Sequence, residues 1–250
     1  MPAAAIIITV TAILRIITIT SMTMDEVALY RLMTWLSPAY PVGAFSHSGG
    51  LEWAVEAGWV HSRASTLSWL ETLLEHGANW NDAVLFTHAY RATIARDLAR
   101  LRDVAALAAA AHPSAERRQE QLAQGAAFRR AARDSRLAPD FLDAIDGELA
   151  YPVAVAIMAA AHAIELGPAL TAFLHSSMAN LVSAAQRLVP LGQTDAQIVI
   201  AALQPAVAAT ARRASACDAC DPFETLGSAT LLADLATMLH ETQYTRLFRT

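Results

Sequence analysis

The two cysteines of the chain lie three residues apart, in Cys217-Asp-Ala-Cys220. A C-x-x-C pair can hold a metal ion or cycle between a dithiol and a disulfide. A zinc site needs four ligands, however, and the sequence offers no second cysteine pair and no nearby histidine to complete one. Two interpretations therefore stay open: an ordinary polar loop, or a helical enzyme that uses this pair for thiol or metal chemistry.

Two further patterns suggest catalysis, and each lacks a required residue. His240-Glu-Thr-Gln-Tyr244 is one residue away from the H-E-x-x-H motif, but a tyrosine stands where the second zinc-binding histidine is needed. Ser46 and His47 could be a nucleophile beside its base, but the G-x-S-x-G elbow is absent. All 18 basic residues are arginine, and without lysine neither a P-loop nor a pyridoxal-phosphate enzyme is possible. We therefore expect no catalytic centre, no metal site and no cofactor.

The composition favours helices. Hydrophobic residues make up 55% of the chain and charged residues 16%, and much of the remainder is alanine and leucine, which form helices readily. A net charge of -5 without a basic stripe argues against nucleic-acid binding. Apolar residues recur at helical spacing from Asp25 onward, and no strand-period run stands out. We predict one all-α domain, a bundle of about ten helices over residues 25–241, with a polar loop near 212–224 and a partner-binding tail at 242–250.

Caps and helix breakers suggest individual boundaries. Asp25 is expected to cap the first helix, Ser65 and Asp82 to open two others, and Ser114 to begin a charged helix that ends near residue 133. That helix is either a solvated face or an arginine-lined partner surface. Residues 150–166 are nearly all apolar and predict a buried central helix, ended by Gly-Pro at 167–168.

The start of the chain differs from the rest. Residues 3–20 are apolar and β-branched, with Arg15 inside the run. A membrane helix needs about 20 apolar residues without a central charge, and a signal peptide carries its charge before the apolar run. We interpret residues 1–24 as a disordered extension that precedes a true start at Met22 or Met24. A membrane anchor is the alternative.

Two segments have the composition of recognition surfaces. Tyr40 and Phe45 lie in a loop rich in proline and glycine, which could also pack on its own core. Tyr244, Leu247 and Phe248 lie beside arginines at the end of the sequence, where no further chain remains to bury them. Aromatic residues and arginine dominate binding hot spots, so both segments are candidates for partner binding.

Three ordered blocks carry a family resemblance. Residues 37–59 (Ser-Pro-Ala-Tyr-Pro-Val-Gly-Ala-Phe-Ser-His-Ser-Gly-Gly-Leu-Glu, then Trp-Ala-Val-Glu-Ala-Gly-Trp), 187–193 (Arg-Leu-Val-Pro-Leu-Gly-Gln) and 240–249 (His-Glu-Thr-Gln-Tyr-Thr-Arg-Leu-Phe-Arg) resemble the UreF family of urease accessory proteins. The resemblance extends loosely over residues 26–250. Together with Asp195, these blocks supply the candidate partner-binding residues: Tyr40, Pro41, Gly43, Phe45, Ser46, His47, Gly50, Glu52, Arg187, Gln193, Asp195, Tyr244, Arg246, Leu247 and Phe248.

The resemblance implies a cytoplasmic, all-helical homodimer that is a scaffold rather than an enzyme. Such a protein binds UreD (also called UreH), recruits the nickel-carrying GTPase UreG, and delivers nickel to apo-urease with them. In the family, the positions of Phe45 and Arg246 are associated with the GTPase, and the tail with UreD. Relatives often carry tyrosine in place of Phe45 and lysine in place of Arg187, and the second change alters hydrogen-bond geometry.

Overall fold

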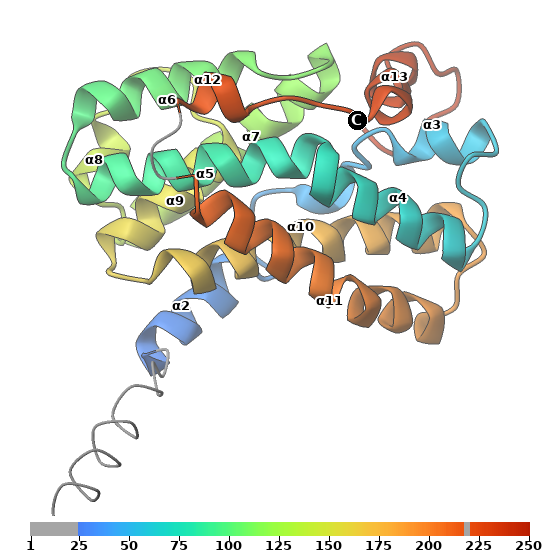
Figure 1. Cartoon of the computed structure of the whole chain (residues 1–250), viewed down its shortest axis with the longest axis horizontal. Helices are drawn as coiled ribbons and strands as arrows, with labels where there is room; N and C mark the ends of the chain where they lie inside the picture. Colours follow the sequence, from blue (N-terminus) through green and yellow to red (C-terminus); the bar gives the residue numbers. More distant parts are fainter. Residues whose placement is uncertain (1–24, 218–220) are drawn as a thin grey trace, which may run out of the picture.

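The computed structural model describes residues 25–217 and 221–250, and over these residues it contains helices and no strand (Figure 1). The all-α prediction is therefore confirmed. The elements are α2 (Glu26–Trp35), η1 (Ala44–Ser46), α3 (Leu51–Glu56), α4 (Arg63–His76), α5 (Ala78–Ile94), α6 (Leu98–Ala110), α7 (Ala115–Asp134), α8 (Asp140–Asp143), α9 (Tyr151–Ala161), α10 (Leu166–Leu188), α11 (Gln193–Ser215), α12 (Pro222–Thr225) and α13 (Leu231–His240). The interpretation of residues 1–24, and Cys220 of the cysteine pair, lie outside the described residues.

Helix α9 is the centre of the bundle. Every residue from Tyr151 to Ala160 is buried, and the helix packs against α5, α7 and α10. The predicted central helix is thus present, but it ends at Ala161 rather than at Gly-Pro 167–168. Those two residues instead lie in the first turn of α10, where a proline is tolerated because its missing N–H would have no helical partner.

Two of the four helix starts expected from capping residues are confirmed. Asp25 accepts a hydrogen bond from the amide of Val27 at 3.3 Å, and Ser114 caps α7, as expected. Asp82, in contrast, lies inside α5, which begins four residues earlier. Ser65 is the third residue of its helix, in a capping box with Ser62. The predicted loop at 212–224 is partly wrong as well, because α11 continues to residue 215 and α12 covers 222–225.

The close approach of α7 to α9 depends on Gly125. A Cβ at this position would overlap the carbonyl oxygen of Leu149, just before α9 begins. With no side chain in the way, the two helices come close enough to bury Phe128 against Tyr151, with ring centroids 5.7 Å apart. The N-terminal half of α7 is thereby placed over the core, where its charged residues can face inward.

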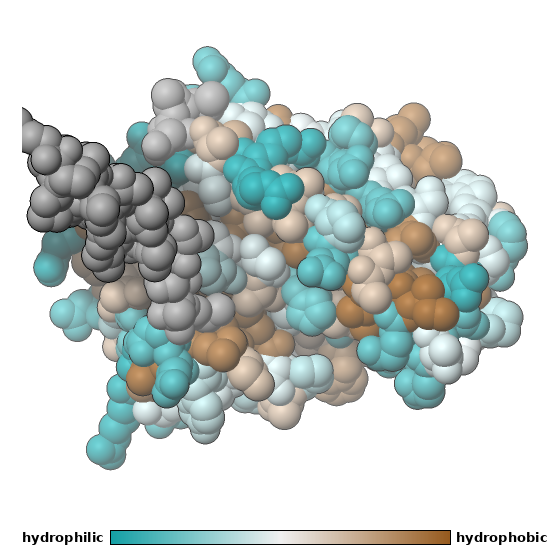
Figure 2. All heavy atoms as spheres, turned by 60° about the horizontal axis from the view of Figure 1, so that its bottom comes forward, coloured by the Kyte–Doolittle hydropathy of each residue, from teal (hydrophilic) through white to brown (hydrophobic). Residues whose placement is uncertain are grey.

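Two helices leave apolar side chains on the surface. Helix α2 packs through Ala28, Leu32 and Trp35, while Val27, Leu29, Tyr30 and Met33 are exposed, and it protrudes from one end of the bundle (Figure 1). Helix α13 exposes Leu231, Leu232, Met238 and Leu239. On the side that carries α10 and α11, apolar residues appear as separate patches between hydrophilic ones (Figure 2). Over the described part of the chain, no helix has the length and apolar character of a membrane span.

Candidate partner-binding site

The loop that follows α2 depends on glycine. Gly43, Gly49 and Gly50 have φ values of 75°, 59° and 83°, in the left-handed region that residues with a Cβ rarely adopt. The sequence predicts such conformations for Gly43 and Gly49, from their place in a loop rich in proline and glycine, and their φ values confirm this prediction. At Gly50 a Cβ would also lie 2.8 Å from the backbone nitrogen of Thr237, so the absence of a side chain lets the loop lie directly against α13.

The two aromatic residues of the loop have opposite environments. Tyr40 is half-buried and packs against Phe128 with ring centroids 5.2 Å apart, and burial raises the pKa of its hydroxyl. Phe45 is 67% exposed. The loop therefore packs on its own core through Tyr40 and presents Phe45, together with the exposed Pro41, to the outside.

The C-terminal tail lies on this loop and does not extend into solvent. Phe248 is only 4% exposed, and the guanidinium of Arg187 lies 4.3 Å from the centroid of its ring. Arg187 also donates a hydrogen bond to the carbonyl oxygen of Phe45 at 3.0 Å, so one side chain joins tail and loop. The expectation that nothing would remain to bury the tail is wrong for Phe248. It holds for Tyr244, which is fully exposed, and for Leu247, at 64%.

Backbone hydrogen bonds continue this pairing. The amide of Arg249 donates to the carbonyl oxygen of Ser46 at 2.8 Å, and the amide of Ser48 donates to that of Thr250 at 2.5 Å. In return, Glu52 at the start of α3 accepts hydrogen bonds from the amides of Leu247 at 2.6 Å and Phe248 at 2.9 Å. The tail therefore satisfies its polar backbone groups with residues that are about 200 positions earlier in the chain.

Beneath the tail lies a buried polar cluster. Thr250 donates to Glu120 on α7 at 3.3 Å, so its hydroxyl accepts from Nδ1 of His47, which is 2.7 Å away. Burial lowers the pKa of His47. Arg117 contacts Glu120 at 2.7 Å and Asp82 at 3.0 Å. Burial raises the pKa of Asp82 to about 6, because the cost of taking its charge out of water exceeds the attraction of Arg117.

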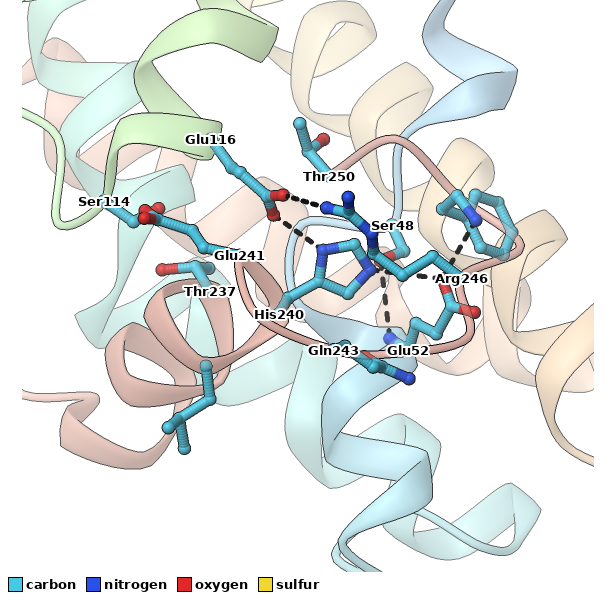
Figure 3. Close-up of polar contacts among 12 residues, drawn as sticks. Ser48, Glu52, Ser114, Glu116, Thr237, His240, Glu241, Gln243, Arg246 and Thr250 are labelled. Carbon is cyan, nitrogen blue, oxygen red and sulfur yellow. Dashed lines mark hydrogen bonds and ion pairs between the residues drawn. The ribbon is translucent and has the colours of Figure 1, made fainter.

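A second cluster joins α3, α7 and the tail (Figure 3). His240 is fully buried at the end of α13, with Nδ1 2.6 Å from Glu116 and Nε2 3.2 Å from Glu52. Glu116 also accepts a hydrogen bond from Arg246 at 2.7 Å. Arg246 therefore has a defined position at the surface, because its partner is itself held by a buried histidine.

Comparison with known proteins identifies the family. The family model described as UreF matches residues 60–204. Urease accessory protein UreF of Rhodopseudomonas palustris strain HaA2 is 56% identical over 225 residues, covering 89% of this chain and 93% of that protein. The protein of the same name from Bradyrhizobium sp. strain BTAi1 is 53% identical over 228 residues, covering 90% and 93%. The chain belongs to the UreF family.

Most of the residues predicted from the resemblance to UreF meet at one place. Arg187 contacts both the loop and the tail, and every tail contact described above is made to the loop, α3, α7 or α10. Two predicted residues lie elsewhere. Gln193 is exposed at the start of α11, and Asp195 pairs with Arg63 on α4 at 2.8 Å. The sequence Thr194-Asp-Ala-Gln197 also predicts a capping box with Thr194 as the N-cap, and this is wrong, because α11 begins at Gln193 with Gly192 as its N-cap.

Sequence reasoning missed the charged residues that support the site. Glu116, Arg117 and Glu120 belong to a helix that was expected to have a solvated or partner-binding face, yet all three point inward. The sequence places His240 in an incomplete zinc motif and at the start of the third UreF-like block, and neither pattern indicates its buried contacts with Glu116 and Glu52. Helical spacing alone gives no signal for these residues, since α7 carries charges around most of its circumference.

A cavity of about 310 Å³ lies behind the loop. Its walls include Tyr40, Phe45, Gln121 and Gln124. Among the described residues, neither the hydroxyl of Tyr40 nor Oε1 of Gln121 has a hydrogen-bond partner. The same part of the chain holds no group of three or more His, Cys, Asp or Glu side chains that could bind a metal ion.

Proposed function

We propose that this UreF protein is a non-catalytic scaffold in urease maturation, and that the surface formed by loop 37–50, the start of α3, α13 and tail 242–250 binds its partners. The relatives named above are urease accessory proteins, which supports this role. The main structural support is the arrangement of the tail. Buried contacts of Phe248 and Glu52 hold it, while Tyr244, Leu247 and Phe45 are left exposed beside it.

UreD is the partner that we assign to α13 and the adjoining tail. The outward face of α13 exposes Leu231, Leu232, Met238 and Leu239, and Leu247 and Tyr244 add to it from the tail. Large exposed apolar surfaces on a soluble domain mark protein interfaces. Docking of UreD would remove these side chains from water, at about 25 cal/mol for each square ångström of apolar surface covered.

The GTPase UreG is the partner that we assign to Phe45 and Arg246. Phenylalanine and arginine are both enriched at the centre of protein interfaces, and arginine is also enriched in binding hot spots. Arg246 keeps 39% of its side-chain surface accessible while Glu116 fixes its position, so little conformational freedom is lost on binding.

The surface that we assign to the homodimer is the exposed face of α2, which carries Leu29, Tyr30 and Met33.

In this proposal the cytoplasmic dimer carries UreD and UreG together to apo-urease, with no part for nucleic acid, membrane or a bound cofactor. A thiol- or metal-dependent enzyme that uses Cys217 and Cys220 is the competing function. Equilibrium dialysis of the purified chain and an assay of thiol activity separate the two functions. An enzyme of that kind binds stoichiometric metal or shows thiol activity, and either property is lost in Cys217→Ala/Cys220→Ala.

Co-expression with UreD and UreG, followed by affinity capture and gel filtration, tests the assignment of surfaces. Leu232→Arg/Leu239→Arg should abolish capture of UreD, whereas Arg246→Ala should spare UreD and reduce recovery of UreG. Ile94→Arg is the matched control, since Ile94 is also exposed but lies on α5. Capture of UreD at wild-type yield by the α13 variant would show that this face is not the docking surface.

A further inference from the structure

The environment of His240 specifies its charge. A neutral imidazole carries one N–H and one bare lone pair. Here both ring nitrogens face carboxylate oxygens, Glu116 at 2.6 Å and Glu52 at 3.2 Å (Figure 3). A lone pair that faces a carboxylate oxygen is repelled, so both contacts are favourable only if both nitrogens donate or if one carboxyl group is protonated.

The proton is better placed on the ring than on either carboxyl group. Both oxygens of Glu52 already accept hydrogen bonds from backbone amides, those of Leu247 and Phe248. The second oxygen of Glu116 accepts from Arg246. Hydrogen bonds donated to a carboxylate stabilise its ionised form. With an imidazolium the cluster contains two anions and two cations and is neutral, which avoids the cost of an uncompensated charge in the interior.

The other charged groups near the cluster have partners of their own. Glu56 accepts from the side chain of Gln243, and Glu241 accepts from the amide of Ala115. Glu120 pairs with Arg117, which also contacts Asp82. None of the contacts described for these groups neutralises Glu52 or Glu116, so that role falls to His240 and Arg246.

We infer that His240 is an imidazolium and that, as the positioning residue for the tail, it joins Glu52 on α3 to Glu116 on α7. Glu52 holds the backbone of the tail and Glu116 holds Arg246. The charge of one buried histidine therefore fixes both the path of the tail and the position of the arginine that we assign to UreG. Only the consequence for UreG rests on the proposed function.

Nitrogen NMR of the histidine-labelled full chain tests the charge directly. The His240 resonances, assigned by their loss in His240→Gln, should show two protonated ring nitrogens at neutral pH. A neutral tautomer with one unprotonated nitrogen would overturn the inference. This measurement requires no partner protein, so it separates a failure here from a failure of the proposed function.

Hydrogen exchange tests the positioning role. In His240→Gln the carboxylates of Glu52 and Glu116 lose the cation between them. We expect the amides of Leu247 and Phe248 to exchange at least about tenfold faster, because their hydrogen bonds to a charged group are weakened. Adding Glu116→Gln removes the excess negative charge, so the double variant should exchange more slowly than the product of the single effects predicts. His175→Gln, on the exposed face of α10, is the control. Wild-type exchange in His240→Gln would refute the positioning role, whatever happens to UreG binding.

Discussion

Replacing Phe248 by alanine tests whether this buried ring of the tail stabilises the fold, in contrast to the exposed residues of the tail that we assign to partner binding. Its ring belongs to an apolar cluster with Leu51, Val60, Val189 and four alanines, and it is 4% exposed. Truncating a buried phenylalanine to alanine costs about 3–5 kcal/mol, because the transfer energy of the ring is lost and a cavity remains. The stacking of Arg187 over the ring is also lost, at about 0.5–1 kcal/mol for an accessible pair.

The neighbouring residue is a natural control. Leu247 is 64% exposed, and its contact with Glu52 is made by its backbone amide, which survives substitution. Leu247→Ala should therefore keep its unfolding free energy within about 0.5 kcal/mol of wild type. In our proposal the same variant loses apolar contact with UreD.

Urea denaturation followed by circular dichroism, paired with capture of UreD, measures both quantities on both variants. We expect Phe248→Ala to lose stability, and Leu247→Ala to keep stability and lose affinity. If the tail can detach without the rest of the domain unfolding, the loss for Phe248→Ala is limited to the free energy of detachment, and faster exchange of the tail amides reveals it. Wild-type stability together with wild-type exchange in Phe248→Ala would refute the burial of this ring.

Three further substitutions test other parts of the structure. Gly125→Ala should lower the unfolding free energy by about 1–3 kcal/mol in urea titrations, because the new methyl group overlaps the backbone before α9. This loss is expected although alanine normally favours a helix. An unchanged or raised unfolding free energy would contradict the close approach of α7 to α9. Burial raises the pKa of Asp82 from 3.8 to about 6, so the folded state binds more protons than the unfolded state between these pH values. The stability of the wild type relative to Asp82→Asn should therefore fall by about 3 kcal/mol as pH rises across this range. A stability difference that is independent of pH would argue against the burial of this carboxyl group. Phe45→Ala should leave the helical circular-dichroism signal intact and weaken UreG binding at least about tenfold, since its ring is exposed; a large loss of thermal stability would show instead that Phe45 is a core residue.

The features that were predicted from sequence are those that short-range chemistry determines. The caps at Asp25 and Ser114 depend on one side chain and the next turn of helix, and both are present. The uninterrupted apolar run around residues 151–160 is typical of a helix buried on all sides, and that helix is present. The conformations of Gly43 and Gly49 follow from their place in a tight loop.

The features that were missed depend on how a helix is rotated and on contacts between distant segments. Arg117 and Arg118 are adjacent and chemically identical, yet their side chains are 11% and 45% exposed, because one residue turns the helix by about 100°. From the sequence Phe248 is expected at the surface, but in the structure the loop and Arg187 cover it. Its contacts with Glu52 join positions 196 residues apart, and no local pattern reports them.

Loop and tail depend on one another for their backbone hydrogen bonds, and this has a consequence for binding. Ser46 and Glu52 accept from tail amides, while the tail accepts from the amide of Ser48. A tail without the loop, or a loop without the tail, would leave these groups unpaired, at about 1–3 kcal/mol for each one that stays buried. We therefore expect the surfaces assigned to UreD and UreG to be lost together when a buried contact such as that of Glu52 is removed. Substitution of Leu247 or Phe45, which make their exposed contacts independently, should remove one partner at a time.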